Sequence, residues 1–126
     1  MPGRVVDASA IAAIVFVERH AADAAAQLNG FDLCAPSLLR FELTNVAVQK
    51  LRQAPLGAGE ISEALEDGLN MITDWADIDC RQVLSIASRY DLTAYDAAYL
   101  WLSVSRGLPL VTFDSRLRAA DKSIHA

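Results

Sequence analysis

Short apolar segments that suit β-strands alternate with longer segments of helical composition along the whole of this 126-residue chain. Each predicted strand is followed by enough residues for a crossover helix, the connection that parallel strands require. The alternation therefore predicts an α/β fold, with a central parallel sheet of four to five strands flanked by helices on both faces. The predicted strands are Arg4–Asp7, Phe31–Ala35, a short strand around Asp74 and Trp75, and a final central strand over Leu110–Phe113.

Helical signals occupy the chain between these strands. The segments are rich in Ala or carry apolar residues at helical spacing, and Gly30 and Gly107 provide stop signals. Pro36 and Ser37 are predicted to open the third helix, and a linker is predicted over Ala54–Gly59. The predicted helices are Ala8–Glu18, Ala21–Leu28, Ser37–Arg52, Glu60–Met71, Cys80–Tyr90, Thr93–Arg106 and Ser115–Ala120.

Length and composition bound the class of protein. The chain fits one domain over residues 1–126, and its 53% hydrophobic content can fill a core. The longest apolar run, Ala10–Val17, is far shorter than the roughly 20 residues of a membrane span, and the N-terminus has no signal-peptide core. These features predict a cytoplasmic protein with no membrane partner. Cys34 and Cys80 have no His at metal spacing, so both are predicted to be small core residues.

A few acidic residues stand out because of where they fall. Asp7 and Asp114 come at the ends of predicted buried strands, and Asp96 lies in an almost wholly apolar helix. Glu42 shares one face of its predicted helix with Asn45, one turn away. An ionised carboxylate in apolar surroundings is costly unless it is paired or binds a cation. These acids therefore indicate a site rather than packing.

Three of these acids also have an ordinary structural interpretation. Asp7 could be a helix N-cap, and Glu42 could be a solvated surface residue. Asp96 is the third residue after the predicted N-cap Thr93, where it could complete a capping box. Asp114 has no comparable structural role in the sequence. The functional interpretation is favoured because several such acids occur together in one chain. Asp96 can be both a capping residue and a site residue.

The acids point to metal-assisted chemistry. The carboxyl ends of parallel strands meet at one edge of a sheet, where α/β proteins bind ligands, so all of these acids can converge there. A carboxylate cluster without His or Cys selects Mg²⁺ or Mn²⁺ over zinc. Mg²⁺ held in this way keeps waters and binds phosphate oxygens, which predicts phosphodiester hydrolysis by a metal-activated water. The polar residues expected to orient ligands or waters are Ser9, Asn45, Thr112 and Ser115.

Short motifs carry a resemblance to a known family. In chain order they are VVDAS at residues 5–9, FELTN at 41–45, YDAAYL at 95–100 and TFDSRL at 112–117. Together they resemble the PIN-domain nucleases, in particular the VapC-type toxins of toxin–antitoxin pairs, over essentially the whole chain. The tail after Asp114, which ends in AADKSIHA, departs from the family because it lacks a convincing last strand.

The resemblance implies a single PIN-like domain that is a Mg²⁺- or Mn²⁺-dependent ribonuclease and halts translation by cutting RNA. It also implies a cognate antitoxin encoded in the same operon and, frequently, a homodimer. By the same resemblance, the catalytic and metal-binding acids of the family fall on Asp7, Glu42, Asp96 and Asp114. The family's supporting polar residues fall on Ser9, Asn45 and Thr112.

The charge of the chain bears on the choice of substrate. A net charge of −5 at pH 7 argues against nucleic-acid binding, because phosphate contacts come mostly from Lys and Arg. If the site acids are neutralised by a cation, however, the remaining acids are nearly balanced by the 11 basic residues. The composition is then compatible with a positive rim around the site.

Two alternatives remain at the level of the sequence. A receiver-like phosphoacceptor domain also binds Mg²⁺ at strand ends, but it needs paired acids after the first strand, where this chain has Ala8 and Ser9. It also needs a Lys after the last strand, and Lys50 and Lys122 are poorly placed for that. The other alternative is a PIN module that binds RNA or a partner without cutting, although such a surface gains nothing from acids that face phosphates.

The remaining distinctive side chains are predicted to be structural. His20 and His125 are separate from the acids and are expected at an exposed helix end and a loose terminus. The apolar face Ile11–Val17 could offer a groove for an antitoxin helix, although core burial is the simpler interpretation. The aromatic residues expected as core or interface anchors are Trp75, Trp101, Tyr95 and Tyr99.

Overall fold

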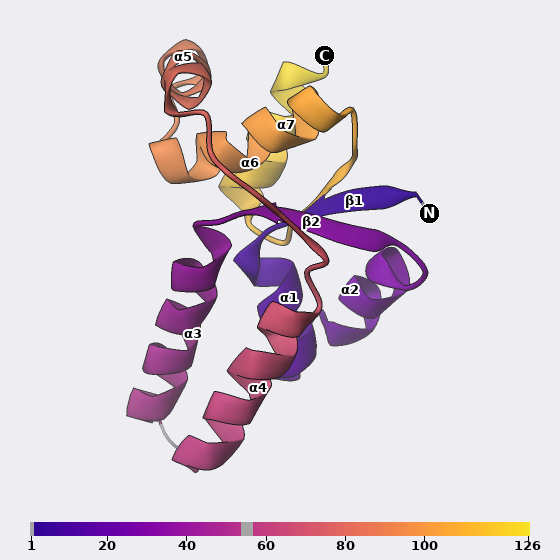
Figure 1. The fold of residues 1–126 in the computed structure, drawn as a ribbon, viewed down its shortest axis with the longest axis vertical. Coiled ribbons are helices and arrows are strands. Elements are labelled where there is room, and N and C mark those ends of the chain that lie inside the picture. The colour runs from indigo at the N-terminus through magenta and orange to yellow at the C-terminus, as the bar shows by residue number, and fades with distance from the viewer. Residues whose placement is uncertain (1, 54–56) are drawn as a thin grey trace.

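A parallel β-sheet forms the middle layer of the computed structural model, which describes residues 2–53 and 57–126 (Figure 1). Within these residues the sheet has four strands, which are β1 (Gly3–Val6), β2 (Asp32–Pro36), β3 (Asp74–Ala76) and β4 (Leu110–Val111). Their order is β3-β2-β1-β4, and every pair is parallel. Val5 of β1 aligns with Cys34 of β2 on one side and with Leu110 of β4 on the other.

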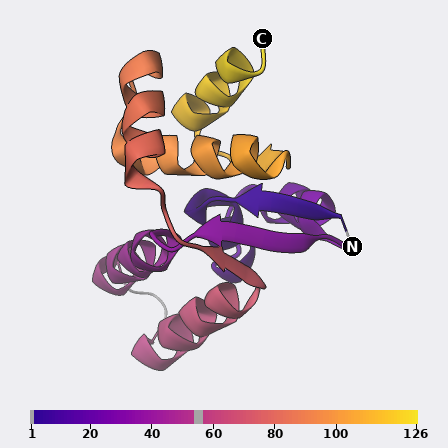
Figure 2. The same cartoon turned by 45° about the horizontal axis from the view of Figure 1, so that its top comes forward.

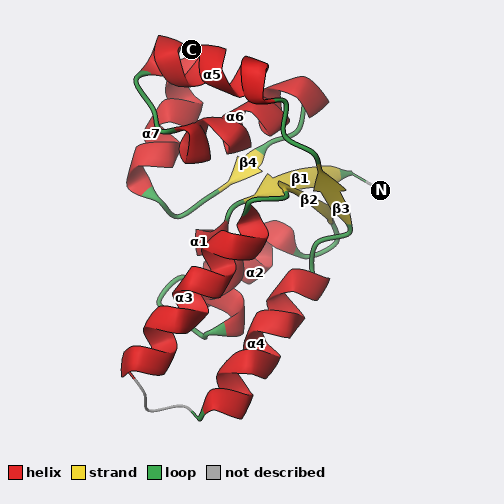
Figure 3. Cartoon of the chain, turned by 60° about the vertical axis from the view of Figure 1, so that its left-hand side comes forward, coloured by secondary structure: helices red, strands yellow, loops and turns green. Residues whose placement is uncertain are grey.

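Helices cover both faces of this sheet. The helices α1 to α4 lie on one side and α5 to α7 on the other, as Figures 2 and 3 show. Their bounds are α1 (Ala8–Val15), α2 (Ala21–Leu28), α3 (Leu39–Gln53), α4 (Ala58–Asn70), α5 (Cys80–Tyr90), α6 (Ala94–Arg106) and α7 (Ser115–Ile124). The α/β fold predicted from the sequence is therefore confirmed, and the bounds of α2 and α5 are those that were predicted.

The last strand differs from its prediction in length and in place. The predicted strand Leu110–Phe113 was expected at the centre of the sheet, but β4 has two residues and is an edge strand that pairs with β1. Its backbone leaves the ladder after Val111, because the next residues make other contacts. The Thr112 carbonyl accepts a hydrogen bond from Arg118 at 2.7 Å, and the Phe113 N–H donates to Ser9 Oγ at 2.8 Å.

Helix boundaries correct two further predictions. Pro36 does not open the third helix: it is the last residue of β2, and α3 begins at Leu39. The tail forms a longer helix than predicted, because α7 continues past Ala120 to Ile124 and buries Leu117 against the core. Of the predicted linker Ala54–Gly59, residues 54–56 lie outside the described part of the chain.

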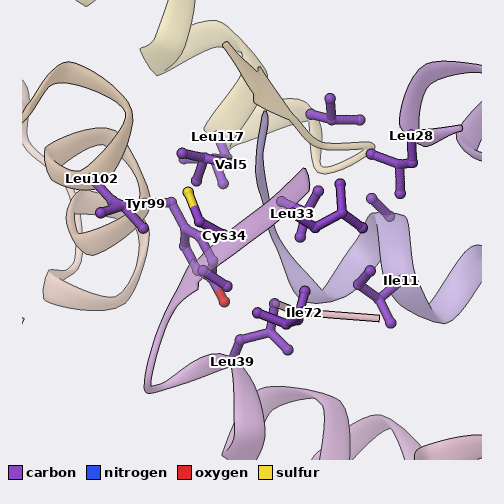
Figure 4. Close-up of a cluster of buried hydrophobic side chains, with 14 of the residues drawn as sticks. Val5, Ile11, Leu28, Leu33, Cys34, Leu39, Ile72, Tyr99, Leu102 and Leu117 are labelled. Carbon is purple, nitrogen blue, oxygen red and sulfur yellow. The ribbon is translucent and has the colours of Figure 1, made fainter. Parts of the chain in front are cut away.

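The core lies on both faces of the sheet and contains mostly aliphatic side chains (Figure 4). Cys34 is buried as predicted, whereas Cys80 is exposed because it begins α5 at the surface. The apolar residues of α1 and of the segment just after it also differ in burial. Ile11 is fully buried in the core, while Val17, just beyond the helix, is 81% exposed. Core burial thus accounts for Ile11 and leaves the end of this face open to solvent.

The length and apolar content of the helices bear on whether any of them could cross a lipid bilayer. A membrane-spanning helix needs about 20 mainly apolar residues. Among the described residues, no helix is long and apolar enough to cross a membrane.

Candidate active site

A cavity of about 230 Å³ opens at the carboxyl edge of the sheet, and all of the predicted site acids line it. β1 ends at Val6, which places Asp7 at this edge, and the chain after β4 brings Asp114 to it. Glu42 is in the first turn of α3, and Asp96 is in the first turn of α6. The complete lining is Asp7, Ala8, Ser9, Glu42, Asn45, Val46, Asp96, Tyr99, Asp114 and Leu117.

Asp7 is held in place by three hydrogen bonds. Its carboxylate caps α1 by accepting from the Ala10 N–H at 3.2 Å, and it also accepts from Ser9 Oγ at 2.7 Å and from Thr112 Oγ1 at 2.5 Å. Only 5% of the residue is exposed, and this burial raises the pKa of Asp7. The three hydrogen bonds oppose the rise in pKa, and the charge of Asp114 adds to it. The N-cap and the cavity position therefore coexist at Asp7.

Two hydroxyl groups connect Asp7 to the opposite end of the chain. Ser9 and Thr112 each donate a hydrogen bond to the Asp7 carboxylate. Each hydroxyl oxygen also accepts a backbone N–H, from Phe113 at 2.8 Å for Ser9 and from Asp114 at 3.0 Å for Thr112. Both predicted supporting residues thus fix the loop that carries Asp114, and they account for the early end of β4.

Glu42 and Tyr99 meet across the cavity. Glu42 is half-buried on α3, and its Oε1 accepts a hydrogen bond from the Tyr99 hydroxyl on α6. Burial raises the pKa of Glu42; the Tyr99 hydrogen bond lowers it, and the charges of Asp7, Asp96 and Asp114 raise it further. Burial first, and then the Glu42 charge, also raise the pKa of Tyr99 above its usual range, so its hydroxyl remains a donor.

The other two acids each stand at the beginning of a helix. The Asp96 N–H donates to Thr93 Oγ1 at 3.2 Å, which confirms Thr93 as the N-cap of α6. Burial, and then the Asp114 charge, raise the pKa of Asp96, while the Arg116 charge opposes the rise. Asp114 caps α7 by accepting from the Leu117 N–H at 2.9 Å. It therefore has a structural role that the sequence did not reveal.

The remaining predicted residues have different positions. Asn45 lines the cavity, one turn after Glu42. Ser115 is exposed at the first position of α7 and is not part of the lining. Tyr99 is buried in the core, as predicted, with 2% of the residue exposed, and it also lines the cavity. The sequence feature that indicates a cavity position for Tyr99 is its spacing, because Tyr99 lies three residues after Asp96 on the same face of one helix.

The charges around the cavity are mixed. Arg116 lies near enough to lower the pKa of Asp96, and Arg118 extends from α7 over the Phe113 ring, with 5.6 Å between its guanidinium carbon and the ring centroid. His20 also stacks on Phe113, with 4.7 Å between the ring centroids. Arg116 of α7 thus contributes positive charge close to Asp96, as binding of a polyanion requires.

The carboxylate oxygens of the cavity are of the kind that a divalent cation prefers. The four carboxylates come without His or Cys, and Asp114 raises the pKa of each of the other three. A hard cation such as Mg²⁺ or Mn²⁺ prefers oxygen donors and relieves this repulsion, so the chemistry of the set fits. Within residues 2–53 and 57–126, no three Asp, Glu, His or Cys side chains are arranged closely enough to hold a metal ion as they stand. Hydrogen bonds to Asp7 and Asp114 orient these carboxylates instead.

Comparisons with known proteins agree with the fold. A family model described as PIN domain matches residues 4–123. The chain is also similar to a solved structure described as the crystal structure of PAE2754 from Pyrobaculum aerophilum, with a TM-score of 0.78 and 28% sequence identity. That alignment covers 96% of this chain and 81% of the other chain. No curated protein matches this sequence.

Proposed function

The chain belongs to the PIN domain family, whose fold is generally that of a nuclease, and on that premise we propose that it is a Mg²⁺- or Mn²⁺-dependent endoribonuclease that hydrolyses RNA phosphodiester bonds. One observation carries this proposal: four separate parts of the chain each bring a carboxylate to a single cavity. The family match favours this function over a receiver-like phosphoacceptor domain. The carboxylates are Asp7, Glu42, Asp96 and Asp114.

Some side chains of the cavity would bind the cation or the substrate, and others would orient the groups that bind. Asp7, Glu42, Asp96 and Asp114 would hold the cation. When bound, it would supply Lewis acidity and a water of lowered pKa. Ser9 and Thr112 fix the Asp7 carboxylate by donating to both of its oxygens. Arg116, on the rim beside Asp96, can pair with a phosphate of the substrate.

We further propose that the protein is a VapC-type toxin that acts in the cytoplasm and is neutralised by a cognate antitoxin. The four sequence motifs support this role. A second observation is an apolar groove of about 540 Å³ beside α2, which suits the apolar face of a partner helix. Exposed Phe41 and Leu84 support assembly as a homodimer, which sedimentation of the purified protein would measure.

Cleavage of RNA by the purified protein tests the nuclease function. We expect a labelled single-stranded RNA to be cut in Mg²⁺ or Mn²⁺ and to remain intact in EDTA. The substitution Asp114→Asn should lower the cleavage rate by about 100-fold or more, the scale at which loss of electrostatic stabilisation acts. Asn is as good an N-cap as Asp, so α7 should remain capped in this variant.

Asp79→Asn is the matched control for this experiment. Asp79 caps α5 through the Gln82 N–H at 3.2 Å, lies on the surface and is not part of the cavity lining. The control variant should cut RNA at the rate of the natural protein. Cleavage that persists both in EDTA and in Asp114→Asn would contradict the metal mechanism. RNA binding without any cleavage would instead support a non-cleaving PIN module.

A further inference from the structure

Tyr99 is a deeply buried aromatic residue in the cavity lining. It is 2% exposed, and its ring packs in the hydrophobic core between the sheet and α6, where Figure 4 shows it. Asp96 lies one turn earlier on the same helix. Residues three apart on a helix share one face, so the face of α6 that carries Asp96 to the cavity also carries the Tyr99 hydroxyl there.

The hydroxyl group has a single described partner. It donates to Oε1 of Glu42, and within the described residues no other side chain or backbone group donates to that carboxylate. Packing alone would be satisfied by Phe, because the ring supplies the buried area and the hydroxyl adds only a polar group that needs a partner. The hydroxyl therefore serves the contact with Glu42.

This contact joins the two helical layers. Glu42 comes from α3, on one side of the sheet, and Tyr99 comes from α6, on the other side (Figure 1). Asp7 has three donors that fix its carboxylate, and Asp114 has the Leu117 N–H. Among the residues that the structure describes, Glu42 has only the Tyr99 hydroxyl as a donor. A half-buried Glu side chain without that contact could turn among several rotamers, and ordering it costs conformational entropy.

We propose that Tyr99 is a positioning residue, which holds the Glu42 carboxylate toward the cavity so that it can bind the divalent cation. The inference rests on the proposed metal-dependent hydrolysis. The hydrogen bond engages Oε1 and leaves Oε2 of Glu42 without a described donor, which keeps that oxygen available to a cation. Groups that orient metal ligands in this way commonly change metal affinity by about 10-fold to 100-fold when they are removed.

Binding of Mn²⁺ to Tyr99→Phe tests the proposal. This variant keeps the ring and removes the hydroxyl. We expect the Kd for Mn²⁺, measured by calorimetry and by electron paramagnetic resonance, to rise about 10-fold. The thermal unfolding midpoint in EDTA should stay close to that of the natural protein. A residue with a purely structural role would move the midpoint and leave the affinity of the folded protein unchanged.

Tyr95→Phe is the matched control, because Tyr95 is on the same helix, is 64% exposed and does not line the cavity. It should bind Mn²⁺ as the natural protein does. A Kd for Tyr99→Phe within about twofold of the natural value, smaller than the effect expected for a group that orients a ligand, would overturn the assignment to Tyr99. If the natural protein itself binds no Mn²⁺ and cuts no RNA, the proposed function fails and the inference fails with it.

A second pair of variants tests whether Tyr99 acts through Glu42. Glu42→Gln removes the charge that Tyr99 is proposed to orient. In the Glu42→Gln background, adding Tyr99→Phe should cause no further rise in the Kd for Mn²⁺, because the positioned group is already lost. If the double variant loses the same factor again, Tyr99 acts through another residue and the proposal is wrong.

Discussion

The acids of the cavity show how one residue can both cap a helix and line a candidate active site. Asp7 caps α1, Asp114 caps α7, and both carboxylates face the same cavity. A parallel strand that ends at a helix N-terminus favours an Asp at the junction, because the side chain accepts a free backbone N–H of the first turn. The same junction is where this fold binds ligands. Capping and ligand binding are therefore compatible at these positions.

Burial of the acids, together with their mutual repulsion, predicts how stability depends on pH in the absence of metal. Asp7, Glu42 and Asp96 have raised pKa values in the folded protein. The folded state thus binds more protons than the unfolded chain just above the ordinary carboxyl pKa of about 4. The stability that these groups contribute is fully present below that pH and is lost as the pH rises through their folded pKa values.

We expect Asp114→Asn to reduce this loss, because the Asp114 charge raises the pKa of each of the other three acids. In EDTA at low ionic strength, calorimetry should show a smaller fall in the unfolding midpoint from about pH 5 to about pH 7.5 than in the natural protein. The difference should amount to a few degrees. Asp79→Asn should leave the slope unchanged. Equal slopes for all three proteins would show that the acids do not repel one another.

At the scale of the elements, α4 packs closely against α1 and α3 through a glycine. A Cβ at Gly68 would lie 2.8 Å from Leu43 Cδ2 and 3.0 Å from Ile11 Cγ2. Both neighbours are fully buried in the core, so neither side chain can move away freely. The close approach of these helices sets the position of α3, and α3 carries Glu42 to the cavity.

Replacing Gly68 with Ala tests this packing. Ala favours a helix interior over Gly by about 1 kcal/mol, but overpacking a core costs about 1–3 kcal/mol. We expect a net loss of stability in Gly68→Ala, measured by urea denaturation. Gly59→Ala is the control in the same helix, since a Cβ there has no neighbour within 4 Å. That variant should be neutral or slightly more stable, and an equal response of both variants would contradict the close approach.

At the scale of the whole molecule, the acid cavity and the apolar groove are separate features. The groove runs beside α2 and β2, and its lining has no residue in common with the acid cavity. A partner bound there would contact the protein without occupying the acid cavity directly. The residues that line the groove are Ile14, Ala25, Ala26, Leu28, Asn29, Gly30, Phe31, Leu33 and Met71.

Under the proposed toxin role, this separation predicts a variant that arrests growth and escapes neutralisation by the antitoxin. Expression of the protein should arrest growth of its native host, and co-expression of the neighbouring gene product should relieve the arrest. We expect Ala26→Glu, which puts a charge into the apolar groove, to arrest growth but to resist relief. Ala22→Glu is the control, because Ala22 is also exposed on α2 and does not line the groove. Absence of arrest by the natural protein would contradict the toxin role.

Much of this arrangement follows from local sequence signals. Strand and helix segments differ in apolar spacing and in cap residues, which is why Cys80–Tyr90 and Ala21–Leu28 could be predicted to the residue. Asp7 and Asp114 were recognisable as candidate ligands because an acid that follows an apolar strand has no packing purpose. These signals depend on neighbours along the chain, so the sequence by itself determined the α/β fold and the four acids that line the cavity.

Contacts between distant residues were decided only by the tertiary structure. Tyr99 and Glu42 are 57 positions apart, and Thr112 and Asp7 are 105 apart. No local pattern distinguishes a core Tyr from one whose hydroxyl reaches an acid on another helix. The hydrogen bonds around Thr112 also draw the chain out of the sheet and shorten β4. Such pairings depend on how helices and strands pack against one another, because only packing brings these groups within hydrogen-bonding distance.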